Sequence, residues 1–203
     1  MRKKLKHIML CTGICALCWC WGIIGDRQTL NQELIRLHVV ADSDSDRDQQ
    51  IKLRVRDAVM ESLSKAMADM TDVEQAKLYI QAQLPKIEKI ANDTLQYLGC
   101  ESTARVSFQE EVFDTRIYDT FTLPAGVYEA LRITIGSGEG KNWWCVVFPT
   151  LCMSAVSEEF ADVAVGAGFS DSLTAALEGK EGYEVRFYLL DMLGKLEGYF
   201  RKG

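Results

Sequence analysis

Residues 34–41 alternate between apolar and polar positions, which predicts a β-strand. Ile35, Leu37 and Val39 alternate with Arg36 and His38. Beyond the acidic segment that follows, the apolar period changes to three or four residues and predicts a helix over 46–69. The stripe of this helix consists of Ile51, Val55, Val59, Leu63, Ala66 and Met70.

A second helical pattern begins at Thr71 and stops at Gly99. Thr71-Asp72-Val73-Glu74 is typical of a capping box, and glycine is a common residue just beyond a helix end. Pro85 lies in the middle of the pattern, so it either kinks one helix or opens a new one. The apolar stripe consists of Val73, Ile80, Leu84, Ile87, Ala91, Thr94 and Leu98.

Strand character dominates after Cys100. Residues 103–112, 128–136 and 143–148 are rich in Val, Ile, Phe, Tyr and Trp and are bounded by Gly or Pro. The segment GSGEGKN, residues 136–142, joins the last two strands and predicts a glycine-rich hairpin. Residues 154–182 have a weak pattern that is rich in small residues. The final segment predicts an amphipathic helix with Val185, Tyr188, Leu189, Met192, Leu196 and Phe200 on one side.

These patterns together predict an α+β fold. Several helices pack on a small, mostly antiparallel sheet in a single domain over residues 34–203. The chain of 203 residues is long enough to bury a core of this kind.

The N-terminal segment is typical of protein export. The first seven residues, MRKKLKH, are basic, and residues 8–25 contain no charged side chain. This arrangement predicts either a cleaved signal peptide or an uncleaved membrane anchor, which would contact the membrane through residues 8–25. Residues 26–33 are read as a polar spacer. Both alternatives, and the positive charge before the apolar segment, place the remainder of the chain outside the cytoplasm.

The exported part of the chain is acidic. It carries 19 Lys and Arg against 29 Asp and Glu, a net charge of −10. Nucleic-acid binding needs a basic surface, and no nucleic-acid-binding motif is present, so we predict no nucleic-acid partner.

Three of the seven cysteines lie in the exported part. Cys11, Cys15, Cys18 and Cys20 belong to the apolar segment, whereas Cys100, Cys145 and Cys152 follow it. Disulfides persist outside the cytoplasm, and Cys145 and Cys152 flank Pro149 at a short distance in sequence. We predict a bridge between them, which would stabilise the fold by roughly 2.5 kcal/mol. Cys100 is left as a buried or free thiol.

The segment DSDSDRD, residues 42–48, admits three interpretations. An EF-hand loop needs Gly at position 6 and Glu at position 12, and neither register of these aspartates supplies them. Ser45 and Asp48 have the spacing of a capping box, and acids favour the start of a helix. Capping leaves Asp42 and Asp44 in surplus, so weak metal binding or recognition of a partner stays open for them. We predict no metal site and no cofactor.

The chain offers no convincing catalytic constellation. The exported part has one histidine, His38, and no Gly-x-Ser-x-Gly motif. A dyad of Cys145 with His38 is left open, although Cys145 lies inside an apolar strand. GSGEGKN lacks the Ser or Thr and the following helix of a phosphate loop. Trp143 and Trp144 point to opposite faces of a strand, so one is assigned to the core and the other to a partner.

Two long segments, LIRLHVVADSDSDRDQQIKLRVRDAV and GEGKNWWCVVFPTLC, resemble the stage II sporulation protein R family of endospore-forming bacteria. The resemblance extends loosely over residues 30–200 and is weakest over 154–182; Thr150 stands where the family often has proline. The matching residues are Ile35, Arg36, His38, Val39, Ala41, Ser43, Asp44, Ser45, Asp48, Gln49, Lys52, Val55, Arg56, Asp57, Ala58, Lys141, Asn142, Trp143, Trp144, Cys145, Phe148, Pro149, Leu151 and Cys152.

This resemblance implies a signalling protein and not an enzyme. Family members are exported from the forespore and activate a membrane-embedded aspartic protease of the mother cell, which then cleaves the precursor of sigma E. We predict that the contact surface includes Arg36, His38, Asp42, Asp44, Asp46, Arg54, Arg56, Asn142, Trp143 and Trp144. The alternatives are an exported enzyme that uses a metal at Asp42, Asp44 and Asp46 or the thiol of Cys145, and a passive cell-envelope domain.

Overall fold

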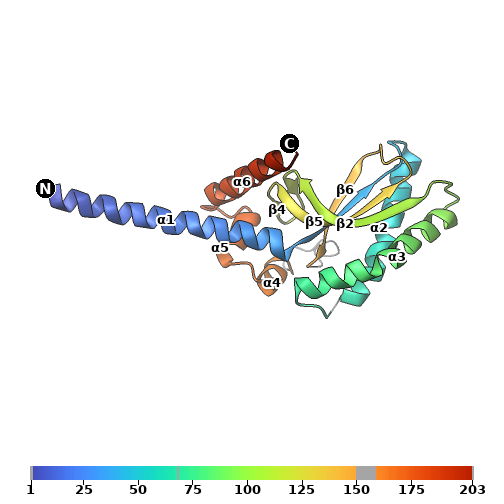
Figure 1. Ribbon diagram of the computed structural model, residues 1–203, viewed down its shortest axis with the longest axis horizontal. Coiled ribbons are helices and arrows are strands. Elements are labelled where there is room, and N and C mark those ends of the chain that lie inside the picture. Colours follow the sequence, from blue (N-terminus) through green and yellow to red (C-terminus); the bar gives the residue numbers. More distant parts are fainter. Residues whose placement is uncertain (1, 68, 150–158, 203) are drawn as a thin grey trace.

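The computed structural model describes residues 2–67, 69–149 and 159–202 and confirms the α+β fold (Figure 1). The helices are α1 (Arg2–Glu33), α2 (Asp46–Met67), α3 (Val73–Tyr97), α4 (Glu159–Gly166), α5 (Asp171–Leu177) and α6 (Glu184–Lys202). The strands are β1 (Ile35–Val40), β2 (Ala104–Phe113), β3 (Arg116–Ile117), β4 (Thr122–Leu123), β5 (Gly126–Ile135) and β6 (Asn142–Phe148).

The main sheet has the strand order β2-β5-β1-β6. β1 is parallel to β5 and antiparallel to β6, and β2 is antiparallel to β5. Every residue of β1 is buried because helices cover both faces of the sheet. The alternation of apolar and polar residues in β1 therefore does not mark a solvent-facing side; Arg36 and His38 lie inside the protein.

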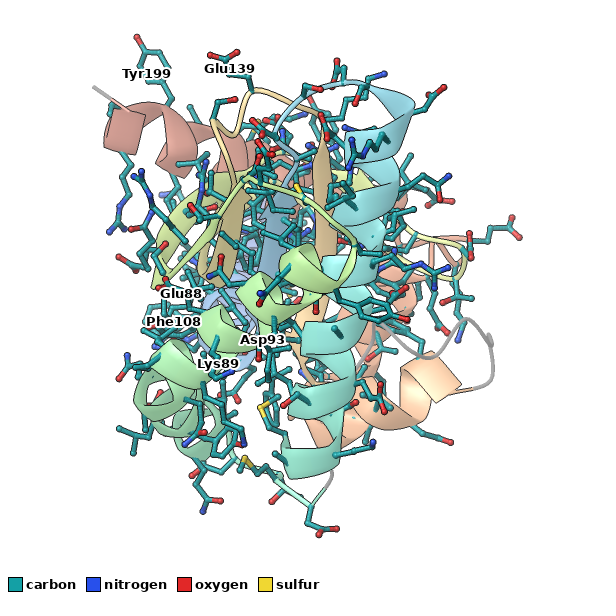
Figure 2. The ribbon with its side chains drawn as sticks, turned by 90° about the vertical axis from the view of Figure 1, so that its right-hand side faces the viewer. Glu88, Lys89, Asp93, Phe108, Glu139 and Tyr199 are labelled. Carbon is teal, nitrogen blue, oxygen red and sulfur yellow. The ribbon has the colours of Figure 1, made fainter. Side chains whose placement is uncertain are left out.

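Each face of the sheet has its own hydrophobic core. Leu37, Val39 and Ile133 pack with α2 and α3 on one face. Phe113, Tyr128 and residues of α1, α4, α5 and α6 pack on the other. Figure 2 shows α2 and α3 lying side by side in front of the strands. The α2 stripe is buried at four of its predicted positions, and Met67, four residues after Leu63 on the same face, completes it in place of Ala66.

The predicted helix boundaries around residue 72 and residue 99 are confirmed. Asp72, not Thr71, caps α3, since its side chain accepts a hydrogen bond from the backbone N–H of Glu74. Helix α3 continues through Pro85 as a single element. Gly99 has a φ of 63°, and the N–H of Cys100 bonds to the carbonyl of Leu95, which closes the helix.

Helix α1 is continuous from residue 2 to residue 33, so the predicted spacer 26–33 is helical. The N-terminal part projects from the body and is exposed, whereas Asp26, Arg27 and Leu30 are buried against the rest of the protein (Figure 1). The helix is long and apolar enough to cross a membrane, a property that signal sequences share. Residues 26–33 are predicted as a spacer because most of their side chains are polar, but Asp26, Arg27 and Asn31 have polar partners in the body.

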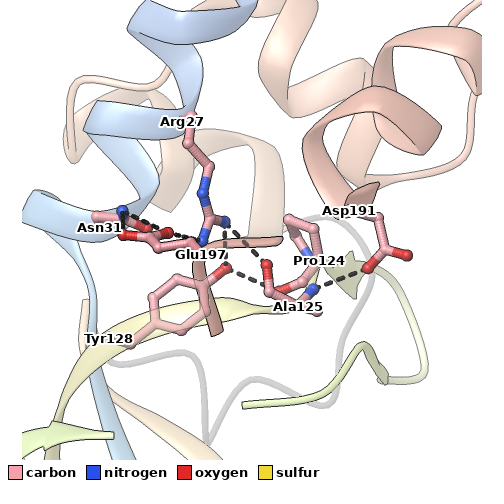
Figure 3. Close-up of polar contacts among 7 residues, drawn as sticks. All are labelled: Arg27, Asn31, Pro124, Ala125, Tyr128, Asp191 and Glu197. Carbon is pink, nitrogen blue, oxygen red and sulfur yellow. Dashed lines mark hydrogen bonds and ion pairs between the residues drawn. The ribbon is translucent and has the colours of Figure 1, made fainter. Parts of the chain in front are cut away.

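Helix α6 packs with the side opposite to the predicted one. A Cβ atom on Gly194 would lie 1.6 Å from the carbonyl oxygen of Ala125, and one on Gly198 would lie 2.7 Å from Val112. The two glycines let the helix approach the sheet closely, and Asp191 accepts a hydrogen bond from the N–H of Ala125 at 2.8 Å (Figure 3). The predicted apolar stripe is therefore left outside, with only Leu189 half-buried among Val185, Tyr188, Leu189, Met192, Leu196 and Phe200.

The glycine-rich segment between β5 and β6 is not a hairpin. β1 lies between these two strands, so the connection crosses over the C-terminal end of β1. The acidic segment that leaves β1 emerges at the same end of the sheet. The prediction of a hairpin was wrong because the residues of the connection do not reveal which strand lies between its ends.

Candidate partner-binding site

The acidic segment 41–45 and the glycine-rich connection 136–141 are bound to each other. The N–H of Gly140 bonds to the carbonyl of Ala41 at 3.0 Å, and that of Glu139 bonds to the carbonyl of Asp42 at 3.2 Å. Glu139 marks the tip of this connection in Figure 2. The two segments, far apart in sequence, form one hydrogen-bonded junction at the end of the sheet remote from the N-terminus of α1 (Figure 1).

Asp42 is the central acceptor of this junction. Its carboxylate accepts hydrogen bonds from the backbone N–H and the hydroxyl of Ser137, both at 2.9 Å, and from the hydroxyl of Ser102. The bonds from Ser102 and Ser137 favour the ionised form and lower the pKa of Asp42. Asp42 is therefore a structural anion that holds three segments of chain together.

Asp44 holds the other end of the connection. Its carboxylate accepts the N–H of Lys141 at 2.7 Å. The carbonyl of Lys141 in turn accepts from the ammonium of Lys52, which also donates to Gln49. Burial lowers the pKa of Lys52, although the nearby charge of Asp44 opposes that shift. Asp42 and Asp44 thus satisfy different backbone groups and do not converge on a common centre.

The capping prediction for this segment is confirmed at Ser45. Its hydroxyl accepts the N–H of Asp48 at 3.1 Å, as expected of a residue that caps α2. The side chain of Asp48 accepts from the hydroxyl of Ser43, which itself accepts the N–H of Ser45 at 3.1 Å. Asp46 lies in the first turn of α2 and is exposed.

Arg36 and His38 support the sheet from inside. The Arg36 guanidinium is fully buried over the ring of Phe113, 4.2 Å from its centroid, and donates to the hydroxyl of Tyr118. His38 lies between the carboxylate of Glu111, at 2.7 Å, and the amide oxygen of Asn142, at 2.8 Å. Both side chains were predicted to contact a partner; Arg36 is fully buried and His38 is 4% exposed in this conformation, so that contact stays a prediction.

Glu111 is the acidic partner of His38 and was missed in the sequence. Burial favours the neutral carboxyl, but the hydrogen bond and charge of His38 and the charge of Arg132 outweigh it and lower the pKa of Glu111. Nothing in the local sequence pairs residue 38 with residue 111, because helices α2 and α3 separate them in the chain and β5 lies between their strands in the sheet.

Trp143 and Trp144 point to opposite faces, as predicted. Trp144 stacks on the His38 ring with 3.8 Å between centroids and lies under the guanidinium of Arg116. Trp143 is 37% exposed, and the guanidinium of Arg56 lies 4.2 Å from its ring centroid. Trp144 is therefore part of the interior, and Trp143 is available at the surface.

Six of the predicted contact residues are exposed or half-buried near the junction, and together they carry both charges. Arg54 is exposed on α2, Arg56 covers Trp143, and Asn142 begins β6 beside the acidic segment. We call this the junction surface and define it by Asp44, Asp46, Arg54, Arg56, Asn142 and Trp143. The structure pairs Arg56 with Trp143, bonds Asn142 to His38 on the opposite face of the sheet, and places Arg54 on another side of α2 from Arg56, so contact of the ten residues with a partner stays a prediction.

The dyad of Cys145 with His38 is not formed. Cys145 belongs to the core under α2 and α3, whereas His38 belongs to the opposite face with Trp144. In the described parts of the chain, no three His, Cys, Asp or Glu side chains gather closely enough to hold a metal ion. Cys152, the second half of the predicted disulfide, lies outside the described residues, so the bridge to Cys145 stays a prediction. Cys100 is a half-buried free thiol.

Comparison with known proteins identifies the family. A sequence model described as stage II sporulation protein R matches residues 31–158. This chain belongs to the stage II sporulation protein R family. The stage II sporulation protein R of Bacillus subtilis (strain 168) is 36% identical over 182 residues, which cover 81% of each chain. No solved structure matches the chain. The matched region contains the whole junction, while α4, α5 and α6 follow it.

Proposed function

We propose that this chain is an exported signalling protein that activates a membrane-embedded aspartic protease of the mother cell. The activated protease would then process the precursor of sigma E. Membership of the stage II sporulation protein R family carries this proposal. The apolar helix α1, which has the length and composition of a signal or anchor, is consistent with export from the forespore.

In this proposal the chain supplies a binding surface and the protease supplies the catalytic groups. A ligand activates an enzyme when it binds the active state more tightly than the inactive one. The junction surface is suited to such binding because its backbone is fixed by Asp42 and Asp44 before any partner arrives. Trp143 with Arg56 offers an exposed aromatic and cationic anchor, a combination that is common at the centres of interfaces.

Reconstitution of the three components tests the function. The chain, the protease and the sigma precursor are co-expressed in a host that lacks all three, and precursor cleavage is followed by immunoblot. We expect cleavage only when all three are present, with loss of cleavage when the protease is omitted. Cleavage that is equally fast without this chain would refute the proposal.

The junction surface is tested in the same assay. Trp143→Ala and Arg54→Ala remove exposed side chains and should lower precursor cleavage about tenfold or more if they lie at the centre of the contact. Leu78→Ala is the matched control, because Leu78 is also exposed, at 66%, but lies on α3. Equal cleavage by the Trp143, Arg54 and Leu78 variants would place the contact elsewhere.

A further inference from the structure

Helix α6 exposes a continuous apolar stripe along its length. Its members are between 39% and 78% exposed and recur every three or four residues, and they are Val185, Tyr188, Met192, Leu196, Tyr199 and Phe200. Tyr199 projects away from the body in Figure 2. An apolar patch of this size is rarely left in contact with water, so the stripe points to an unidentified occupant.

The stripe is not needed by the core of the protein. Helix α6 is fixed by its opposite side, where Leu190 is fully buried and Gly194 touches the backbone of Ala125. Asp191 on that side accepts hydrogen bonds from Ala125 and from the hydroxyl of Thr115. The bulky residues therefore remain free to contact another body.

Two ion pairs fix α6 across the end of α1. Asp26 pairs with Arg186 at 2.5 Å. Arg27 pairs with Glu197 at 2.6 Å (Figure 3). Asp26 and Arg27 are neighbours in α1, whereas their partners lie eleven residues apart, about 16 Å along an α-helix. Glu197 also accepts a hydrogen bond from Asn31, so helix α6 crosses α1 obliquely and its C-terminal part lies farther from residues 8–25 than its start does (Figure 1).

The apolar part of α1 ends where α6 begins. The uncharged run covers residues 8–25, and Asp26 is the first charged residue after it. A bilayer crossed by this run has its outer boundary next to Asp26. Arg186, in the first turn of α6, reaches Asp26 and lies beside Gly22. The start of α6 is thus at the level of that boundary, together with the exposed Trp21 and Tyr188.

We infer that α6 lies in the outer interface of the bilayer that α1 crosses, with its apolar stripe against the lipid. The occupant is the lipid surface because the start of α6, at Arg186, adjoins the end of the apolar run of α1 at Gly22 and Asp26, and an amphipathic helix at a membrane surface buries its apolar stripe in the interface. The exported part is acidic and is therefore repelled by anionic lipid. The favourable free energy of binding comes from burial of the apolar stripe. This inference goes beyond protease activation and does not depend on it.

Cross-linking to lipid in native full-length protein tests the inference. The chain is inserted into vesicles of phosphatidylcholine that contain a photoactivatable phosphatidylcholine, and the adducts are mapped by mass spectrometry. We expect adducts in residues 8–25 and in α6, and none in α3 around the exposed Leu78 and Tyr97. The adducts in α6 should persist in high salt. Adducts confined to residues 8–25, absence of adducts from α1, or cross-links between two copies of α6 would each overturn the inference.

A triple variant of the stripe tests whether adducts in α6 depend on its apolar side chains or only on the closeness of α6 to the bilayer. Tyr188→Ser, Leu196→Ser and Phe200→Ser together remove three exposed apolar side chains and should lower adduct formation in α6 about tenfold. Adduct formation in residues 8–25 should be unchanged, which shows that insertion is intact. The control carries Leu78→Ser and Tyr97→Ser and should leave α6 adducts at the wild-type level. Unchanged α6 adducts in the triple variant would contradict the inference, whether or not the chain activates the protease.

Discussion

The carboxylate of Asp42 occupies the space that a side chain at position 136 would need. A Cβ atom on Gly136 would lie 2.2 Å from the carboxylate, and Gly136 has a φ of 55°. The contact joins the end of β1 to the end of β5, because these parallel strands end at the same edge of the sheet. This contact gives Asp42, which lies before the residues that cap α2, a role in holding the ends of β1 and β5 together.

Gly136→Ala should destabilise the fold by about 3 kcal/mol, since it combines a left-handed backbone with a clash against Asp42. Gly99→Ala is the matched control: its φ of 63° is similar, but no atom lies within 4 Å of the added Cβ. The control substitution should lower the free energy of unfolding by about 1 kcal/mol. Urea denaturation measures both, and equal losses would show that the contact with Asp42 contributes nothing.

Asp42→Asn should destabilise the fold at neutral pH by about 1–2 kcal/mol, because a charged acceptor of several hydrogen bonds is lost. The pKa of Asp42 is lower in the folded state than its ordinary value of 3.8. Its contribution is therefore complete above about pH 5 and is lost as the pH falls through the folded pKa.

The acid dependence of unfolding should accordingly be weaker in Asp42→Asn than in the wild type. Glu111 also has a lowered pKa, because the interactions with His38 and Arg132 outweigh burial, so part of the acid dependence should remain. Free energies of unfolding at pH 7 and pH 3 measure the difference. An identical fall in stability for both proteins would contradict the assignment of Asp42 as a structural anion.

Trp144→Ala should destabilise the fold by about 3 kcal/mol, because the ring packs between His38 and Phe113. Trp143→Ala should cost less than about 1 kcal/mol, because Trp143 is partly exposed and contacts Arg56 at the surface. Thermal denaturation distinguishes the two neighbours. A larger loss for Trp143 would mean that the assignment of the two rings to surface and interior is reversed.

Asp26→Asn should destabilise the attachment of α1 more than Glu197→Gln does. The pair Asp26–Arg186 has side-chain exposures of 8% and 15%, whereas Glu197 in the pair with Arg27 is 39% exposed. Removing one partner of a buried pair costs about 3–5 kcal/mol, and an exposed pair contributes less. Hydrogen exchange of the backbone amides of residues 26–33 reports how firmly α1 is attached to the body. Equal protection in both variants would show that burial does not determine how much each ion pair contributes to this attachment.

Local patterns in the sequence determined much of this fold. The period of the apolar residues located β1, α2 and α3, and Gly99 located the end of α3, because these signals depend on neighbours within one turn or one strand. The family motifs also lie in continuous segments, so the family was recognised from the same residues that the comparison matches. The capping role of Ser45 is local for the same reason.

Tertiary structure alone decided which side of each element is covered. The stripe of α6 has a correct helical period, yet Gly194 and Gly198 turn it outward, since close approach to the sheet needs small residues. Arg36 and His38 look like the polar side of a strand, but helices on both faces of a central strand bury them. The roles of Asp42 and Asp44 likewise depend on a connection about 95 residues away in the chain, brought to them because β1 lies between β5 and β6. Pairing order and packing faces are properties of the assembled sheet, and no window of sequence contains them.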